Sequence, residues 1–279
     1  MSRIGAEVDR YVRSESLPTV WCPGCGNGTI VQGLAVALSR LGIAPEDVAV
    51  VGGIGCSGRT PFYVRTQAMH TTHGRALAFA TGLKMANPSL HVVVTTGDGD
   101  ALAIGAGHFI HAARRNIDLT VLLYNNSVYG MTGGQAAPTT PPGARTTTTL
   151  GGSVDRPFDA ADLALAAGAT YVARTTTFDM QEVPLRIQEA IAHPGFALVE
   201  ILTQCPTYFG RLNRIGDPSD MLLWERELSE GGAPPLLTRE DLVGPLPTGV
   251  FRRQHRVEFS AAYADMCSAR GGVYHGTRT

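Results

Sequence analysis

The chain has 279 residues, of which 44 % are hydrophobic and 17 % charged, and its formal net charge is −1. This balance excludes a strongly basic nucleic-acid-binding surface, and no stretch approaches the roughly eighteen apolar residues of a membrane span. The first residues lack the apolar core of a signal peptide, and five cysteines are too few for a disulfide scaffold. We therefore expect a soluble, cytoplasmic protein whose clustered cysteines are metal ligands or catalytic groups.

Short apolar segments alternate with helical patterns along most of the chain. The segments read as strands because they are apolar on both faces, which is typical of parallel strands covered by helices on both sides. Predicted strands lie at residues 48–51, 91–95, 119–124 and 197–202, and predicted helices at 28–41, 75–86, 101–115, 159–167 and 180–192. This alternation predicts an α/β fold with a doubly wound, mostly parallel sheet that binds ligands at the carboxyl ends of its strands.

Two regions depart from the alternation. Residues 133–155 are rich in Gly, Pro and Thr, and a loop of this length is usually functional or mobile. Residues 211–279 show no further strand–helix alternation and contain a Gly-Gly-Ala-Pro-Pro run. We expect one α/β domain over residues 1–210 and a C-terminal extension over 211–279 that packs on a partner subunit.

Four of the five cysteines are spaced for a thiolate site. Cys22 and Cys25 flank a Pro-Gly turn that lets both sulfurs face one metal, whereas Cys56 and Cys205 each follow a predicted strand. Iron–sulfur clusters are commonly held by four such thiolates, but four cysteines also bind zinc. From the cysteines alone, a cluster and a zinc site are nearly equal alternatives.

A second set of polar residues fits a diphosphate held through a divalent cation. Asp98 supplies a carboxylate at a predicted strand end, and Gly97 and Gly99 allow close backbone approach to phosphate oxygens. After the next strand, Asn126 offers an amide oxygen and Val128 a backbone carbonyl. These are the hard oxygen ligands that Mg²⁺ requires, so the two strand ends predict a magnesium–diphosphate site.

Three nearby side chains carry open alternatives. Asp100 either contacts the cofactor or caps the helix that follows it. His73 either contacts the cofactor or caps a helix start. The Thr132 hydroxyl either reaches a diphosphate oxygen or stabilises a turn.

At these residues the chain resembles a known family. Gly-Asp-Gly at 97–99, followed after about twenty-five residues by Asn-Asn, is the diphosphate motif of thiamine diphosphate enzymes. The run Asn125-Asn126-Ser127-Val128-Tyr129-Gly130-Met131-Thr132 resembles the beta subunit of 2-oxoacid:ferredoxin oxidoreductases, as do Cys-Pro-Gly-Cys-Gly at 22–26, Gly-Ile-Gly-Cys-Ser-Gly-Arg at 53–59 and His-Gly-Arg at 73–75. The resemblance covers roughly residues 15–212.

The resemblance implies a thiamine diphosphate-binding fold, Mg²⁺ on Asp98, Asn126 and Val128, and one 4Fe–4S cluster on Cys22, Cys25, Cys56 and Cys205. It implies cofactor contacts from Ile54, Gly55, Cys56, Ser57, His73, Gly97, Asp98, Gly99, Asp100, Asn126, Val128, Tyr129, Gly130, Met131 and Thr132.

The implied reaction is the oxidative decarboxylation of a 2-oxoacid with transfer of the acyl group to coenzyme A, reversible as reductive carboxylation. Electrons leave singly through the cluster to ferredoxin. No motif supplies the glutamate that activates thiamine, which in this family comes from an alpha subunit, so an obligate heteromer is expected.

Substrate choice depends on few residues. Arg59 and His73 are the candidate catalytic residues, and Arg59 is suited to pair with a second substrate carboxylate through its planar guanidinium. The run from Cys205 to Arg211 resembles 2-oxoglutarate-type members, which favours 2-oxoglutarate as substrate and succinyl-CoA as product.

Three other functions stay open at this point. The chain could be a pyruvate-type member of the same family, a non-oxidative thiamine diphosphate lyase with a structural zinc, or a cluster-bearing scaffold without catalysis.

Overall fold

The computed structural model describes residues 3–230 and 246–270. Its centre is a seven-stranded sheet in the order β2-β1-β3-β4-β8-β7-β9. Every neighbouring pair is parallel except β7 and β9. The strands are β1 (Val48–Gly52), β2 (Gln67–His70), β3 (His91–Gly97), β4 (Thr120–Asn125), β7 (Tyr171–Thr176), β8 (Ala197–Leu202) and β9 (Gly249–Arg253). The predicted α/β class and mostly parallel sheet are confirmed.

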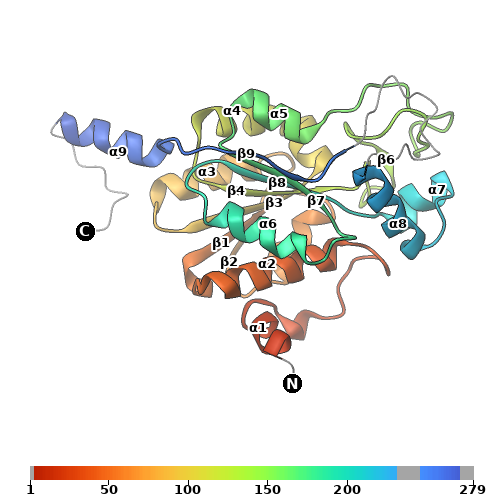
Figure 1. Cartoon of the computed structure of the whole chain (residues 1–279), viewed down its shortest axis with the longest axis horizontal. Helices are drawn as coiled ribbons and strands as arrows, with labels where there is room; N and C mark the ends of the chain where they lie inside the picture. Colours follow the sequence, from red (N-terminus) through yellow and green to blue (C-terminus); the bar gives the residue numbers. More distant parts are fainter. Residues whose placement is uncertain (1–2, 231–245, 271–279) are drawn as a thin grey trace.

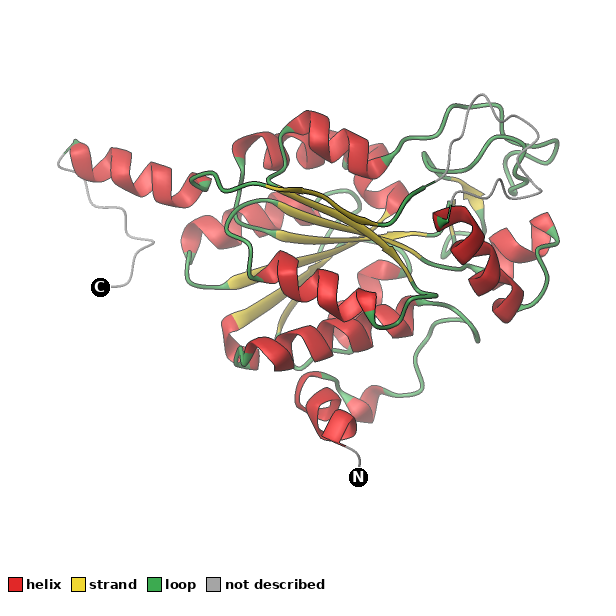
Figure 2. Cartoon of the chain, viewed as in Figure 1, coloured by secondary structure: helices red, strands yellow, loops and turns green. Residues whose placement is uncertain are grey.

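Helices cover both faces of the sheet (Figures 1 and 2). One face packs on α2 (Asn27–Leu41) and α6 (Glu182–Ile191), which share a buried core with α1 (Arg3–Tyr11). The other face packs on α3 (Ala76–Ala86), α4 (Ala106–Arg115) and α5 (Ala160–Ala167). This two-sided burial explains why the central strands carry Val, Leu and Ile at successive positions instead of alternating with polar residues.

The strand register brings three strand ends together. Gly97 at the end of β3 pairs with Tyr124 of β4, and Asn125 at the end of β4 pairs with Leu202 at the end of β8. Because these strands are parallel, the segments that leave them start at the same edge of the sheet. The residues after β1, β3, β4 and β8 therefore meet at the end of the sheet that faces α7 (Arg211–Asn213) and α8 (Pro218–Ser229) (Figure 1).

A short hairpin and a long loop follow β4. The hairpin pairs β5 (Val128–Tyr129) with β6 (Gln135–Ala136). The loop beyond it is tied down by backbone bonds such as Gly143 N to Ser153 O at 2.8 Å and Thr147 N to Gly134 O at 2.9 Å. The loop predicted from its composition is therefore ordered against the hairpin.

Part of the expected C-terminal extension belongs to the same body. Strand β9 adds to the sheet beside β7, and α8 contributes Met221 to a small core with Phe209. Helix α9 (Phe259–Ala269) follows and extends away from the sheet (Figure 1). Contact of this extension with a partner subunit stays a prediction, and residues 231–245 and 271–279 lie outside the described part. None of the described helices is both long and apolar enough to span a membrane.

Candidate functional site

A small pocket of about 90 Å³ lies where β1, β3 and β4 end. Its lining includes every residue that the sequence predicted for the cofactor. The members are Ile54, Gly55, Cys56, Ser57, His73, Gly97, Asp98, Gly99, Asp100, Asn126, Val128, Tyr129, Gly130, Met131 and Thr132, together with Asn27 and Tyr124. Segments from residue 54 to residue 132 thus share one pocket, as the doubly wound fold requires.

Asp98 is the buried carboxylate of this pocket. It is 2 % exposed, its Oδ1 accepts a hydrogen bond from Gly99 N at 2.9 Å, and its Oδ2 accepts one from Thr139 Oγ1. Burial raises the pKa of Asp98 to about 6, although these hydrogen bonds act in the opposite direction. A buried carboxylate of this kind is stabilised in its charged form by a nearby cation, which fits a divalent metal ion.

The Asn125–Val128 segment faces Asp98 from the neighbouring strand. Asn126 Oδ1 accepts from Val128 N at 3.2 Å, which holds the amide of Asn126 at the pocket wall. Asn125 turns the other way and donates to Glu200 Oε1 at 2.7 Å. Ser127, which follows the two asparagines, has a φ of 62°, a left-handed conformation that reverses the chain after β4. One asparagine therefore faces the pocket and the other anchors the strand end.

Asp100 does not cap a helix. It is the first residue of a π-helical turn (Asp100–Ile104), and its side chain makes no capping bond. Its carboxylate instead accepts from Gly74 N at 2.7 Å and from Thr96 Oγ1 at 2.7 Å, and it is paired with His73 Nδ1. The prediction that Asp100 caps the following helix is therefore wrong. The His73 side chain, which is paired with Asp100, lines the pocket.

Arg59 lies outside this pocket. It lines a neighbouring surface depression with Phe62 and Met131, where its guanidinium lies 5.6 Å from the Phe62 ring centroid. Met131 lines both sites, so Arg59 is at the rim of the cofactor pocket. The Thr132 hydroxyl donates to Gln135 Oε1 at 2.7 Å, which is the turn role that the sequence left open.

The four predicted ligand cysteines are free thiols; Cys22 is exposed, and Cys25, Cys56 and Cys205 are half-buried. Burial raises the pKa of the Cys25 thiol to about 12, the Asn27 backbone opposes this, and the thiolates of Cys56, Cys205 and Cys22 add to the rise. Burial likewise raises the pKa of Cys56 to about 11, with a further contribution from Cys205 and Cys22. The thiol pKa values of Cys25 and Cys56 are thus influenced by the other predicted ligand cysteines.

Two close approaches bring the cysteine segments together. A Cβ placed on Gly24, whose φ is +77°, would lie 2.4 Å from Pro218 and 3.7 Å from Pro206, so the Cys22–Cys25 turn lies against the chain that follows Cys205. A Cβ on Gly130 would lie 3.4 Å from Cys56 Sγ and 3.7 Å from Cys205 Sγ. Within residues 3–230 and 246–270, however, no three His, Cys, Asp or Glu side chains already form a metal-binding group. The cluster on these cysteines stays a prediction.

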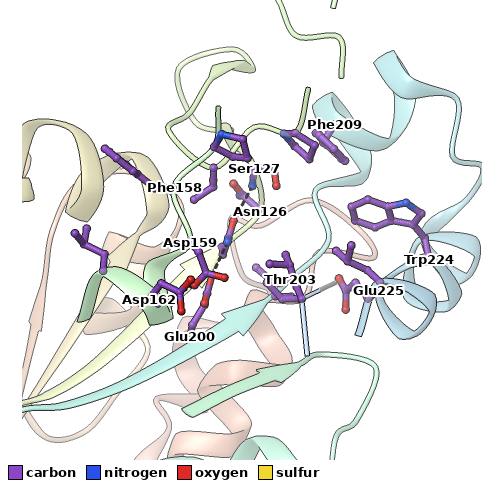
Figure 3. A pocket seen from close by; sticks show the side chains of 18 of the residues that line it. Asn126, Ser127, Phe158, Asp159, Asp162, Glu200, Thr203, Phe209, Trp224 and Glu225 are labelled. Carbon is purple, nitrogen blue, oxygen red and sulfur yellow. Dashed lines mark hydrogen bonds between the residues drawn. The ribbon is translucent and has the colours of Figure 1, made fainter. Parts of the chain in front are cut away.

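A larger cavity, of about 770 Å³, lies behind the Asn125–Ser127 segment and was not predicted. Figure 3 shows Asn126 and Ser127 at its edge, with Asp159, Asp162 and Glu200 on one side and Trp224 and Glu225 on the other. Buried Arg174 pairs with Glu200 at 2.7 Å and Asp159 at 2.6 Å. Glu200 also accepts a hydrogen bond from Asn125, so the Arg174–Glu200–Asp159 ion pairs help to fix the end of β4.

Sequence reasoning missed three residues at the cofactor pocket. Asn27 and Tyr124 line it, and Thr139 fixes Asp98 from the long loop. Asn27 Nδ2 is buried with no hydrogen-bond partner among the described residues, so it presents an unused donor that suits a bound polar group. The position of Asn27 directly after Cys25-Gly26 could have identified it as a pocket residue from the sequence. Nothing in the composition of the loop singles out Thr139.

The chain is similar to several known proteins. The family model described as "Thiamine pyrophosphate enzyme, C-terminal TPP binding domain" matches residues 53–201. The 2-oxoglutarate synthase subunit KorB of Archaeoglobus fulgidus is 51 % identical over 254 residues, covering 91 % of this chain and 92 % of the relative. The subunit of the same name from Methanocaldococcus jannaschii is 48 % identical, covering 90 % of this chain and 93 % of the relative.

A solved structure has the same fold along nearly the whole chain. The 2-oxoglutarate:ferredoxin oxidoreductase from Magnetococcus marinus, solved with 2-oxoglutarate, coenzyme A and succinyl-CoA bound, superposes with a TM-score of 0.85 at 36 % identity. The match covers 95 % of this chain and 91 % of that chain. The chain therefore belongs to the beta subunits of 2-oxoacid:ferredoxin oxidoreductases, and to their 2-oxoglutarate type.

Proposed function

We propose that this subunit and an alpha subunit together convert 2-oxoglutarate and coenzyme A to succinyl-CoA and carbon dioxide, and pass the electrons singly to ferredoxin. The observation that carries the proposal is the single pocket lined by every residue expected to hold thiamine diphosphate. The solved relative that binds 2-oxoglutarate, coenzyme A and succinyl-CoA supports this choice of substrates.

Asp98, Asn126 and the Val128 carbonyl would hold Mg²⁺ and, through it, the diphosphate. Asp98 and Asn126 offer hard oxygen atoms at adjacent strand ends, which is the donor chemistry that Mg²⁺ prefers. When bound, thiamine diphosphate supplies the electron sink that allows carbon dioxide to leave a 2-oxoacid. The work of this chain is to hold the diphosphate end and to exclude water from the pocket.

Cys22, Cys25, Cys56 and Cys205 would hold a 4Fe–4S cluster, which accepts one electron at a time. Gly130 supports this arrangement, because it belongs to the pocket lining and a Cβ placed on it would lie 3.4 Å from Cys56 Sγ and 3.7 Å from Cys205 Sγ. The thiols therefore adjoin the proposed cofactor pocket, as electron transfer from one to the other requires. Zinc would fit the same thiols but has no redox chemistry.

The pocket is small, about 90 Å³, and its lining contains no glutamate among the described residues. We infer that the alpha subunit completes the site and supplies the group that activates thiamine, because no motif of this chain does so. Ferredoxin is the proposed electron acceptor of the complex.

The test is to purify the complex of this chain and its alpha subunit without oxygen and to compare Asp98→Asn with Asp155→Asn. Asp155 is an exposed acidic residue, so it controls for the same chemical change elsewhere. We expect Asp98→Asn to lower 2-oxoglutarate-dependent electron transfer by more than about 100-fold. Its iron content and visible spectrum should match those of the wild type.

Three results would contradict the proposal. Full activity of Asp98→Asn would refute the magnesium assignment. A colourless complex that contains zinc and releases carbon dioxide without an electron acceptor would identify a lyase. An active complex that uses pyruvate and not 2-oxoglutarate would place the enzyme in the pyruvate class.

A further inference from the structure

Cys22 is the predicted cluster ligand that regular secondary structure holds least. Cys56 directly precedes a 3-10 helix, Cys25 leads into α2, and Cys205 follows β8. Cys22 is exposed and lies in neither a helix nor a strand. The position of its thiol therefore depends on the contacts that its neighbours in the sequence make.

Trp21, directly before Cys22, is bonded to the Cys56 segment. Its indole Nε1 donates a hydrogen bond to the backbone carbonyl oxygen of Cys56 at 2.8 Å. The two residues are 35 positions apart in the sequence. The bond thus joins the backbone of one predicted ligand to the side chain beside another.

Tyr63 makes a second connection to the same segment. Its hydroxyl accepts a hydrogen bond from Val20 N at 2.8 Å, and its ring centroid lies 4.8 Å from that of Trp21. Tyr63 is 5 % exposed, and its backbone carbonyl accepts a hydrogen bond from Arg13 N at 2.9 Å. The chain before Cys22 is therefore held at Val20 as well as at Trp21.

Both acceptors flank one short helix that is fixed to the sheet. The 3-10 helix Ser57–Phe62 begins directly after Cys56 and ends directly before Tyr63. Within it, the hydroxyl of buried Thr60 is hydrogen-bonded to that of Tyr124 in β4 at 3.1 Å. Tyr124 also lines the cofactor pocket. The segment before the first thiol is thus tied to the strand ends that form this pocket.

We propose that Trp21 and Tyr63 are positioning residues that hold the Cys22 segment against the Cys56 segment in the chain that has not yet bound iron. A thiolate on a loose segment would lose conformational freedom on binding a metal ion, and this loss would weaken binding. Two hydrogen bonds and a ring contact that fix the segment in advance reduce that cost. The inference rests on the proposed function and deepens it.

The alternative is a purely structural role, in which the two aromatic side chains stabilise the fold and leave the cysteines unaffected. A structural contact would change the melting temperature without changing the retention of iron. Loss of a positioning contact would loosen Cys22, and the iron atom bound to this thiolate would leave first, which produces a three-iron cluster. The two roles therefore differ in a spectroscopic signature.

The experiment compares Trp21→Phe with Trp224→Phe in the complex of this chain and its alpha subunit, purified without oxygen. The chain has two tryptophans, and both contact an aromatic ring, but Trp224 Nε1 has no hydrogen-bond partner among the described residues. Both variants keep an aromatic ring, so only Trp21→Phe loses a hydrogen bond. We expect it to lose iron to a chelator about 10- to 100-fold faster than the wild type, the range typical of partners that orient metal ligands. Trp224→Phe should lose iron at the wild-type rate.

Tyr63→Phe and Tyr11→Phe form a second pair, because each removes one hydroxyl from a buried ring. The Tyr11 hydroxyl donates to Ile43 O at 2.7 Å, a contact that involves no predicted ligand segment. Both variants should lower the melting temperature, but only Tyr63→Phe should accelerate iron loss. Electron paramagnetic resonance of the oxidised complex should show a three-iron signal in Trp21→Phe and Tyr63→Phe and none in their controls.

Two results would overturn the inference. The first is iron loss at the wild-type rate in either Trp21→Phe or Tyr63→Phe. The second is equal acceleration in all four variants, because iron loss would then follow overall stability. Tyr63→Phe differs from the wild type by one hydroxyl, so the test stands even if Trp21→Phe does not assemble. A wild-type complex without iron would instead refute the cluster of the proposed function.

Discussion

Thr139 donates a hydrogen bond to Asp98 across a sequence separation of 41 residues. The donor lies in the long loop after the β5–β6 hairpin, and the acceptor is the carboxylate expected to bind magnesium. This bond fixes the direction of the carboxylate oxygens before any cation is present. The long loop therefore helps to orient the Asp98 carboxylate.

Replacing Thr139 with Val should weaken magnesium–thiamine diphosphate binding about 10- to 100-fold, because partners of metal ligands typically contribute that much. Thr147→Val is the matched control, since Thr147 is exposed in the same loop. Cofactor titration monitored by activity or by fluorescence measures the effect. Equal affinities of the two variants would show that Thr139 does not orient the ligand.

Replacing Gly130 with Ala should lower the iron content of the complex. The added methyl group would lie 3.4 Å from Cys56 Sγ and 3.7 Å from Cys205 Sγ, which are ordinary van der Waals distances, so the chain without a cluster should still fold. The methyl group would, however, fill space beside both sulfurs that the proposed cluster needs. Gly28→Ala, where nothing lies within 4 Å, is the control. Iron analysis and visible absorption report the outcome, and wild-type values for Gly130→Ala would contradict the cluster assignment.

Replacing Arg59 with Gln should raise KM for 2-oxoglutarate about 10- to 100-fold and change KM for pyruvate little, since a hydrogen bond to a charged group is worth roughly 1.5–3 kcal/mol. Arg59 contacts Phe62 and Met131 and has no acidic partner among the described residues, so its charge is available to a substrate carboxylate. Arg115→Gln on α4 serves as the control. Equal effects on both substrates would exclude this role.

Glu225 should make stability depend on pH. Burial raises the pKa of Glu225 to about 8, well above the ordinary value of 4.5 for a glutamate, so the folded chain binds a proton more tightly than the unfolded chain. Stability is then full near pH 4.5 and falls as the pH rises toward 8. Glu225→Gln mimics the protonated acid and keeps an acceptor for Thr177, whose hydroxyl bonds Glu225 Oε2 at 2.9 Å.

We therefore expect Glu225→Gln to melt at the wild-type temperature near pH 5 and above it at pH 8 and higher. Thermal unfolding at several pH values measures the difference. Glu230→Gln at the exposed end of α8 controls for the loss of a charge. Parallel pH profiles of wild type and Glu225→Gln would refute the buried-acid explanation.

The central strands could be predicted because most of their residues are apolar on both faces. β1, β3, β4 and β8 were all predicted within two residues at either end, although β8 also carries buried Glu200. β2 and β7 were missed for opposite reasons. β2 is a fully exposed edge strand, Gln-Ala-Met-His, whereas β7 is buried but carries Arg174, whose charge is neutralised by Glu200 and Asp159.

The residues predicted to contact the cofactor all line one pocket, because they belong to short motifs at strand ends; Asn27 and Tyr124, which also line it, were not predicted. The parts that escaped prediction depend on contacts between distant segments. The bond from Thr139 to Asp98 and the pairing of His73 with Asp100 exist only once the sheet has brought the segments together. A hydrogen bond of this kind leaves no periodic pattern in the sequence.

The position of Cys205 just beyond β8 has a consequence for biogenesis. Cys22 and Cys25 precede the first strand of the sheet, whereas Cys205 emerges only after β8 has been synthesised, and β8 must insert between β4 and β7 before its end meets the other thiols. The proposed cluster therefore needs donors from both ends of the sheet-forming part of the chain. Its four thiols can converge only after β8 has taken its place between β4 and β7.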